Sequence, residues 1–258
     1  MSREPYKRAV VTGATSGIGA ATVHALCAGG FDVLAVARRA DRLRSLADSV
    51  GCQTLTADIR DTPRMRAEIA QFAPDVVVNN AGVGHGITGL AGLPPEHVAE
   101  AIEINVIAPI QITAAAIEGM KHRGHGHIVN IGSISGLHTL VSAVYGASKA
   151  ALHQFSQNLR YELAGTGLRV TEICPGRVAS EFYEHAVGDA SRLEMAKTSG
   201  ITELQPEDIA SAILFAVNAP AHVNIATIEL LPTEQAVGGI SVQPAPTISN
   251  KAQNDAPT

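Results

Sequence analysis

The chain of 258 residues is long enough for one large domain, and its 46% hydrophobic residues can form a sizeable buried core. A formal net charge of -5, with only short basic clusters, argues against nucleic acid as a partner. The opening residues 1–8 are charged rather than apolar, and no stretch approaches about 18 uninterrupted apolar residues, so we expect no membrane association and a cytoplasmic location.

Short apolar runs alternate with helix-period stretches from the N-terminus onward. This pattern predicts repeated βαβ units and therefore an α/β fold, a doubly wound parallel sheet flanked by helices. Seven strands are expected near 8–12, 32–37, 53–56, 76–79, 127–131, 169–174 and 227–231. Two long helices are expected near 94–120 and 143–164.

The segment 177–204 interrupts the alternation, because it is long and mixed in polarity. Insertions of this kind often act as lids over a binding site. Pro206-Glu207-Asp208 then favours a helix start, since proline and acids suit the first turn. We predict a single domain over 1–240, with a lid at about 177–204 and a loose polar tail at 241–258.

A glycine-rich turn follows the first predicted strand, in the order Thr12-Gly13-Ala14-Thr15-Ser16-Gly17-Ile18-Gly19, and a helix comes next. Gly13 can adopt a backbone conformation closed to other residues, Gly17 lets a pyrophosphate approach, and Gly19 allows close helix packing. The helix N-terminus offers free N–H groups to an anion. Strand, turn and helix together favour a dinucleotide site over an ordinary tight turn.

The end of the second strand indicates which dinucleotide is bound. An NAD site would place an acid there for the ribose 2′-hydroxyl, whereas this chain has Ala37 followed by Arg38 and Arg39. Arg38 can pair with a 2′-phosphate, so we predict NADP(H); a solvated arginine pair is the alternative. Asp58, after the third strand, is a candidate acceptor for the adenine amino group, or an ordinary strand-end acid.

Several further motifs occur in one order along the chain: Asn79-Asn80-Ala81-Gly82, Asn105, Ser133, Tyr145-x3-Lys149 and Pro175-Gly176. Together with the glycine-rich turn, they resemble the short-chain dehydrogenase/reductase family over about 8–231. The resemblance implies a single Rossmann-type domain, a substrate lid after Pro-Gly, and a homodimer or homotetramer formed through the two long helices. In Asn-Asn-Ala-Gly, a structural role between the central strands stays open beside cofactor contact.

Tyr145 and Lys149 are four residues apart in a helical stretch, so they project from one face. An ammonium beside a phenol, with oxidised nicotinamide, would lower the tyrosine pKa toward working pH, which makes Tyr145 the candidate general acid/base. Ser133, at the end of the fifth strand, is the candidate for orienting the substrate oxygen; Ser135 fits the family spacing less well. The resemblance assigns Asn105 to a proton-relay water and Lys149 to the nicotinamide ribose.

Taken singly, these residues have ordinary explanations, as a half-buried aromatic, a solvated lysine and a strand-end cap, but together they favour a catalytic set. The predicted cofactor-binding residues are Gly13, Thr15, Ser16, Gly17, Ile18, Gly19, Arg38, Arg39, Asp58, Ile59, Asn80, Ala81, Gly82, Tyr145, Lys149, Pro175, Gly176, Val178 and Ser180. The predicted substrate-binding residues are Ser133, Tyr145, Arg177, Phe182 and Tyr183. Arg177 would meet an acidic substrate group or lie at the surface; as an alternative to a polar pocket, Phe182 and Tyr183 would line a less polar one.

No metal site is predicted. The three cysteines form no CxxC pair, and the histidines within 122–127 lie in a glycine-spaced turn without an acidic or cysteine companion.

The predicted activity is hydride transfer between NADP(H) and a small, polar alcohol or its carbonyl counterpart. The C-terminal sequence is similar to the branch of the family containing serine and 3-hydroxy acid dehydrogenases and sulfoacetaldehyde reductases. Two alternatives are a non-catalytic nicotinamide-binding sensor or scaffold and an epimerase or dehydratase with a transient nicotinamide step. The intact motif set disfavours the first alternative, and the short C-terminal part disfavours the second.

Overall fold

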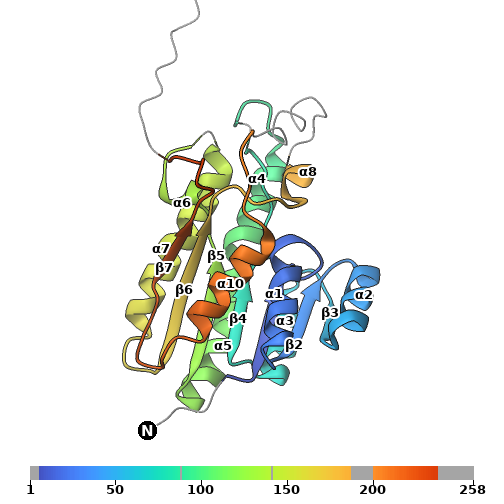
Figure 1. Ribbon diagram of the computed structural model, residues 1–258, viewed down its shortest axis with the longest axis vertical. Helices are drawn as coiled ribbons and strands as arrows, with labels where there is room; N and C mark the ends of the chain where they lie inside the picture. Colours follow the sequence, from blue (N-terminus) through green and yellow to red (C-terminus); the bar gives the residue numbers. More distant parts are fainter. Residues whose placement is uncertain (1–5, 88, 141, 187–199, 238–258) are drawn as a thin grey trace, which may run out of the picture.

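The computed structural model describes residues 6–87, 89–140, 142–186 and 200–237. In this part of the chain, seven parallel strands form one sheet in the order β3-β2-β1-β4-β5-β6-β7 (Figure 1). The strands are β1 (Arg8–Thr12), β2 (Asp32–Ala37), β3 (Gln53–Thr56), β4 (Val76–Asn79), β5 (Gly126–Ile131), β6 (Leu168–Pro175) and β7 (Thr227–Leu230). The predicted fold class is confirmed, and each strand lies within one residue of its predicted ends.

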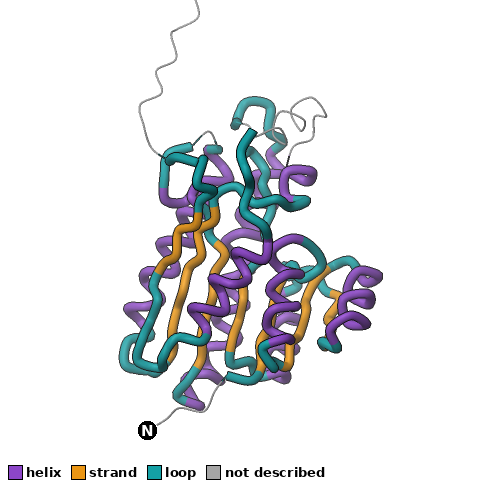
Figure 2. The backbone as a smooth tube through the Cα atoms, viewed as in Figure 1, coloured by secondary structure: helices purple, strands orange, loops and turns teal. Residues whose placement is uncertain are grey.

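Helices cover both faces of the sheet (Figure 2). One face carries α1 (Gly17–Ala28), α2 (Ala40–Val50) and α10 (Pro206–Val217). The other carries α3 (Thr62–Phe72), α5 (Ala108–Arg123) and α7 (Ala143–Glu162). The central strands β1, β2, β4, β5 and β6 are largely buried because both sides are covered, which explains why apolar residues dominate them, although β5 and β6 also bury polar side chains such as Asn130 and Glu172.

The long helix expected at 94–120 has three parts, namely α4 (Pro95–Ile102), a π-helical turn η1 (Glu103–Ile107) and α5. Pro109, in the first turn of α5, has no amide hydrogen to donate to the carbonyl four residues earlier, that of Asn105. The helix therefore widens over this stretch, as π-helical turns do at many functional sites. The turn carries Asn105, one of the predicted catalytic residues.

The continuous helical segment 95–123 is long and apolar enough to cross a membrane by length and composition, with 44% of its apolar window buried in the fold. Core helices of soluble proteins pass the same test. Here α5 packs against α3, and Ile112 and Met120 are almost completely buried in the core, so the segment is a core helix.

The start of α10 is fixed by its acidic first turn, where the Asp208 carboxylate accepts a hydrogen bond from the Gln205 backbone N–H at 2.8 Å. Asp208→Ala should lower the free energy of unfolding by about 1 kcal/mol, because capping bonds contribute about that much. The melting temperature should fall by about 2–4 °C in a chain of this size. Glu207→Ala is the control, since it removes an acid from the same turn without this bond. An equal loss in both variants would assign the effect to charge alone.

Candidate active site

The site lies where the strand order reverses, at the carboxyl ends of β1 and β4, which is where ligands bind in sheets of this topology. Thr12 joins the two strands, because its hydroxyl accepts hydrogen bonds from the backbone N–H groups of Asn80 and Ala81, both at 3.1 Å. The Asn80 amide donates in return to the Thr12 carbonyl at 2.8 Å. These bonds hold the glycine-rich turn beside the Asn-Asn-Ala-Gly stretch.

A cavity of about 770 Å³ opens at this edge of the sheet. It brings together most of the predicted site residues, although they come from seven distant parts of the chain. Those lining it are Gly13, Thr15, Ser16, Gly17, Ile18, Arg38, Arg39, Asp58, Ile59, Asn80, Ala81, Gly82, Ser133, Tyr145, Lys149, Pro175, Gly176, Arg177, Val178, Ser180, Phe182 and Tyr183. Gly19 and Asn105 lie behind the lining.

The glycine-rich turn has the geometry of a phosphate-binding site. Gly13 has φ +65° and Gly17 φ +49°, in the left-handed region that favours glycine. A side chain at Gly19 would place its Cβ 2.2 Å from the Gly13 carbonyl oxygen, so close packing requires glycine there. Ser16 begins α1 without a side-chain capping bond, which leaves the first N–H groups of the helix available to an anion.

The two arginines after β2 differ in their surroundings. Within the described part of the chain, the exposed Arg38 side chain lines the cavity without a hydrogen-bond or ion-pair partner. Arg39 instead donates to the hydroxyls of Thr15 and Ser16, at 3.0 and 2.8 Å. Asp58 is paired with Arg60 at 2.7 Å, and hydrogen bonding to Arg60 holds the pKa of the Asp58 carboxyl below its usual range. The turn, the helix N-terminus and the unpartnered arginine fit NADP(H).

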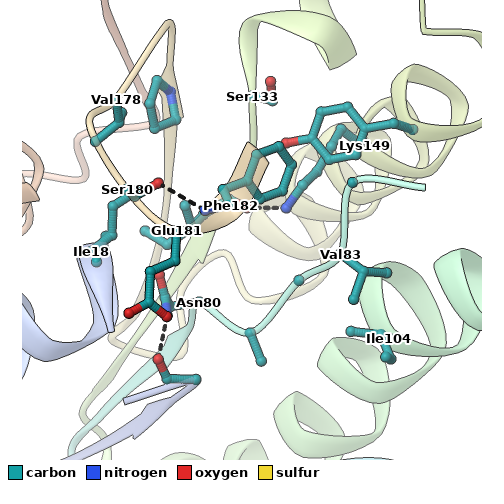
Figure 3. A pocket seen from close by; sticks show the side chains of 18 of the residues that line it. Ile18, Asn80, Val83, Ile104, Ser133, Lys149, Val178, Ser180, Glu181 and Phe182 are labelled. Carbon is teal, nitrogen blue, oxygen red and sulfur yellow. Dashed lines mark hydrogen bonds between the residues drawn. The ribbon is translucent and has the colours of Figure 1, made fainter. Parts of the chain in front are cut away.

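Ser133, Tyr145 and Lys149 meet at one end of the cavity, and Figure 3 shows Ser133 and Lys149 on the side opposite Ile18 and Ser180. All three side chains are more than nine-tenths buried. Ser133 follows the end of strand β5. Its hydroxyl accepts a hydrogen bond from the Ser135 backbone N–H at 3.1 Å, so Ser133 caps the start of the short helix α6 (Ile134–Leu137).

Lys149 is held by the backbone, because its ammonium donates to the Ile131 carbonyl at 2.7 Å. The same ammonium lies 5.9 Å from the centre of the Tyr145 ring. Both residues come from α7 at a spacing of four, as the sequence predicted.

Burial acts against the predicted lowering of the Tyr145 pKa. Burial raises it above its ordinary value, and this effect exceeds the lowering caused by a hydrogen bond with Ser133. Burial also lowers the pKa of Lys149 to about 8, against the raising effect of the nearby Glu172 charge. The protein alone therefore keeps the phenol protonated, and the expected lowering requires the oxidised nicotinamide together with the Lys149 ammonium.

Asn105 supports the site from behind the cavity lining. It is completely buried, and its side chain bonds both backbone groups of Val83, each at 2.9 Å, and the Ser148 hydroxyl, also at 2.9 Å. A side chain at Gly82 would place its Cβ 3.2 Å from the Asn105 Oδ1 and 3.5 Å from the Lys149 Nζ. Asn105 thus lies close to the lysine and links η1, α7 and the loop after β4.

The start of the predicted lid lines the other side of the site. Phe182 begins α8 (Phe182–Ala186), and its ring lies 5.4 Å from that of Tyr145. Arg177 faces the cavity rather than the surface; its Nε bonds Glu203, and its guanidinium lies 4.5 Å from the Tyr183 ring centre. The Nη2 of Arg177 is buried and has no hydrogen-bond partner among the described residues. Residues 187–199 of the predicted lid, and the predicted tail, lie outside the described residues.

Other sequence features have structural roles. Asn79 donates to Asn130 and Thr113 in the core, at 2.9 and 3.1 Å, so the first asparagine of Asn-Asn-Ala-Gly stabilises the central strands. His127 is buried against the Thr171 hydroxyl at 2.8 Å, and His125 pairs with Asp75 at 3.2 Å.

Glu181 and Gln235 are among the lining residues that no sequence motif indicated. Glu181 lines the cavity and pairs with Arg39 from 142 positions away. Gln235 accepts the Arg177 backbone N–H at 2.8 Å and so brings the C-terminal part of the described chain to the cavity. Neither side chain belongs to a local motif, and only the tertiary contact identifies it.

Comparison with known proteins agrees with this geometry. The family model for short chain dehydrogenases matches residues 7–190. The chain is 38% identical over 242 residues to the NADP-dependent 3-hydroxy acid dehydrogenase YdfG of Salmonella typhi, a match that covers 90% of this chain and 98% of that protein. The Escherichia coli K12 protein of the same name is 36% identical over 243 residues, with the same coverage.

A solved structure of serine dehydrogenase, in its closed form and complexed with NADP+, superimposes with a TM-score of 0.87 at 36% identity. That match covers 92% of this chain and 99% of the other. Sequence motifs, strand order and these similarities agree, and the chain belongs to the short-chain dehydrogenase/reductase family.

Proposed function

We propose that the protein is an NADP(H)-dependent oxidoreductase that transfers a hydride between nicotinamide and a small, polar alcohol, or the corresponding aldehyde or ketone. The observation that carries the proposal is the single cavity that joins the glycine-rich turn and Arg38 to Ser133, Tyr145 and Lys149. The similarity to 3-hydroxy acid and serine dehydrogenases supports a hydroxy acid as the substrate class.

In this mechanism the bound cofactor supplies or accepts the hydride. The Tyr145 hydroxyl gives a proton to the carbonyl oxygen during reduction, or takes it from the alcohol during oxidation. The Ser133 hydroxyl orients the substrate oxygen against Tyr145. The Lys149 ammonium holds the cofactor ribose and favours the ionised tyrosine, and Asn105 keeps the lysine end of the site in place.

Turnover by the purified protein tests this function. NADPH and NADH would each be offered with small aldehydes and keto acids, and NADP+ and NAD+ with 3-hydroxy acids and serine, while the nicotinamide absorbance is followed. Turnover with NADP(H) is expected. Tight cofactor binding without turnover would favour a sensor or scaffold, and turnover without net change in nicotinamide absorbance would favour an epimerase or dehydratase.

Arg177 is the proposed partner of the substrate carboxylate, because its cationic side chain lines the cavity beside the Pro-Gly segment. Arg177→Gln should raise KM for a hydroxy acid about tenfold with a smaller change in kcat. The effect is moderate because Glu203 already neutralises part of the charge. A neutral alcohol of similar size is the matched control, and an equal rise in its KM would show that Arg177 only shapes the pocket.

We also propose that residues 177–204 form the substrate lid of a domain spanning 1–240, that 241–258 form a tail, and that the protein works in the cytoplasm. A homodimer or homotetramer is proposed from the family. The exposed apolar side chains of Ile102 and Ile107, on the first of the two long helical segments, support it. Light scattering on the purified protein measures the assembly.

A further inference from the structure

Glu181 connects the start of the lid to the arginines at the beginning of α2. Its carboxylate accepts two hydrogen bonds from the Arg42 guanidinium, at 2.7 and 2.9 Å, and one from Arg39 at 3.1 Å. These contacts join positions 139 and 142 residues apart in the chain. In Figure 3, Glu181 lies on the segment that follows Ser180.

The Glu181 carboxylate lies in an arginine cluster formed by Arg39 and Arg42. Arg39, which it contacts, also donates to Thr15 and Ser16 in the glycine-rich turn. Hydrogen bonds from Arg42, and then from Arg39, hold the pKa of the Glu181 carboxyl below its usual range, so it is ionised at neutral pH. The negative charge of Glu181 therefore lies next to residues that the sequence predicts to bind the phosphates of the cofactor.

The neighbouring arginine is in the opposite situation. Arg38 lines the same cavity, and its guanidinium has no hydrogen-bond or ion-pair partner within the described ranges. An incoming 2′-phosphate thus meets one available guanidinium, together with an Arg39 already engaged by a carboxylate.

We propose that Glu181 determines the cofactor affinity and specificity of this protein, acting as an internal anion that competes with the 2′-phosphate for the arginine cluster. The proposal rests on NADP(H) being the cofactor. Glu181 opposes NADP(H) binding by repulsion and by neutralising Arg39 and Arg42, and most of the preference for NADP(H) over NAD(H) is left to Arg38. Weaker binding of the 2′-phosphate would favour release of the cofactor, and product release limits turnover in many enzymes.

Glu181→Gln removes the charge and keeps the size of the side chain. The ratio of the NADH to the NADPH dissociation constant should rise about three- to tenfold at low ionic strength, because only NADPH carries the 2′-phosphate. Salt should reduce the increase, since Glu181, Arg39 and Arg42 are all more than a third exposed. Any loosening of the lid weakens both cofactors alike and cancels in the ratio.

The experiment titrates NADPH and NADH, by nicotinamide fluorescence, into the wild-type protein, Glu181→Gln and Asp48→Asn. Asp48→Asn removes one exposed acid from α2 outside the cavity and controls for net charge. Circular dichroism checks that each variant is folded. A rise confined to Glu181→Gln supports the proposal; an unchanged or lower ratio, or an equal rise in Asp48→Asn, overturns it. Failure of the wild-type protein to prefer NADPH would instead overturn the proposed cofactor, and the inference with it.

Discussion

Tyr145→Phe should lower turnover by about 10²- to 10⁴-fold, which is the usual contribution of a general acid/base. The phenyl ring keeps the contact with Phe182, whose ring centre lies 5.4 Å away, and so fills the same space. Only the hydroxyl that exchanges a proton with the substrate oxygen is lost. NADPH affinity should therefore stay within about twofold of the wild-type value, well under 1 kcal/mol. Steady-state rates and fluorescence titration measure the two effects separately.

The pH dependence adds a second readout for the same residue. Because burial raises the pKa of Tyr145, the phenol is protonated at neutral pH and ready to donate during reduction. Oxidation needs the ionised form, so the rate of alcohol oxidation should rise with pH, whereas the rate of carbonyl reduction should not. Burial lowers the pKa of Lys149 to about 8, so above that pH the lysine loses the charge that supports the tyrosinate. The rise in the oxidation rate should therefore become less steep above about pH 8. Tyr145→Phe should abolish the rise.

Tyr161→Phe is the control for loss of a tyrosine hydroxyl, because Tyr161 is on the same helix and 87% exposed. It should leave turnover and its pH profile unchanged. If Tyr145→Phe kept wild-type turnover, the proton donor would be another group and the proposed mechanism would be wrong.

Arg38→Ala should weaken NADPH binding by about 10- to 100-fold, because hydrogen bonds to charged groups contribute about 1.5–3 kcal/mol. NADH, which has no 2′-phosphate, should bind almost as before. The guanidinium lines the cavity without a hydrogen-bond or salt-bridge partner in the described part of the protein, and its charge is only the smallest of the causes that lower the pKa of Asp58, so its removal should not unfold the chain. Fluorescence titration with both cofactors at two salt concentrations gives the preference and its electrostatic share.

Arg44→Ala is the matched control, since Arg44 is an exposed arginine of α2 outside the cavity. An equal loss of NADPH affinity in both variants would indicate a general effect of positive charge. Arg38→Lys should recover part of the affinity, because a lysine keeps the charge but not the two parallel hydrogen bonds. If Arg38→Ala left NADPH binding intact, recognition of the 2′-phosphate would depend on Arg39 instead.

The strand positions were predictable because their signal is local. The central strands β1, β2, β4, β5 and β6 are covered on both faces and are therefore rich in apolar residues, whereas the edge strands β3 and β7 are only partly buried. Short strands of this kind, separated by helix-period stretches, leave few alternatives to a parallel sheet. The conformation of the turn with Gly13, Gly17 and Gly19 was predictable for a similar reason, since its backbone angles and close contacts require glycine at these positions. The sequence alone therefore determined the fold class, the phosphate-binding turn and the Tyr145–Lys149 spacing.

Only the tertiary structure decided how these parts meet. The π-helical turn at Asn105, the burial that raises the pKa of Tyr145, and the pairing of Glu181 with Arg39 all depend on contacts between distant segments. Local propensity reports the conformation of a few neighbouring residues, whereas desolvation and ion pairing depend on which segments the fold brings together. The charge of Glu181 beside the predicted cofactor site, unlike the glycine-rich turn itself, is set by the tertiary structure.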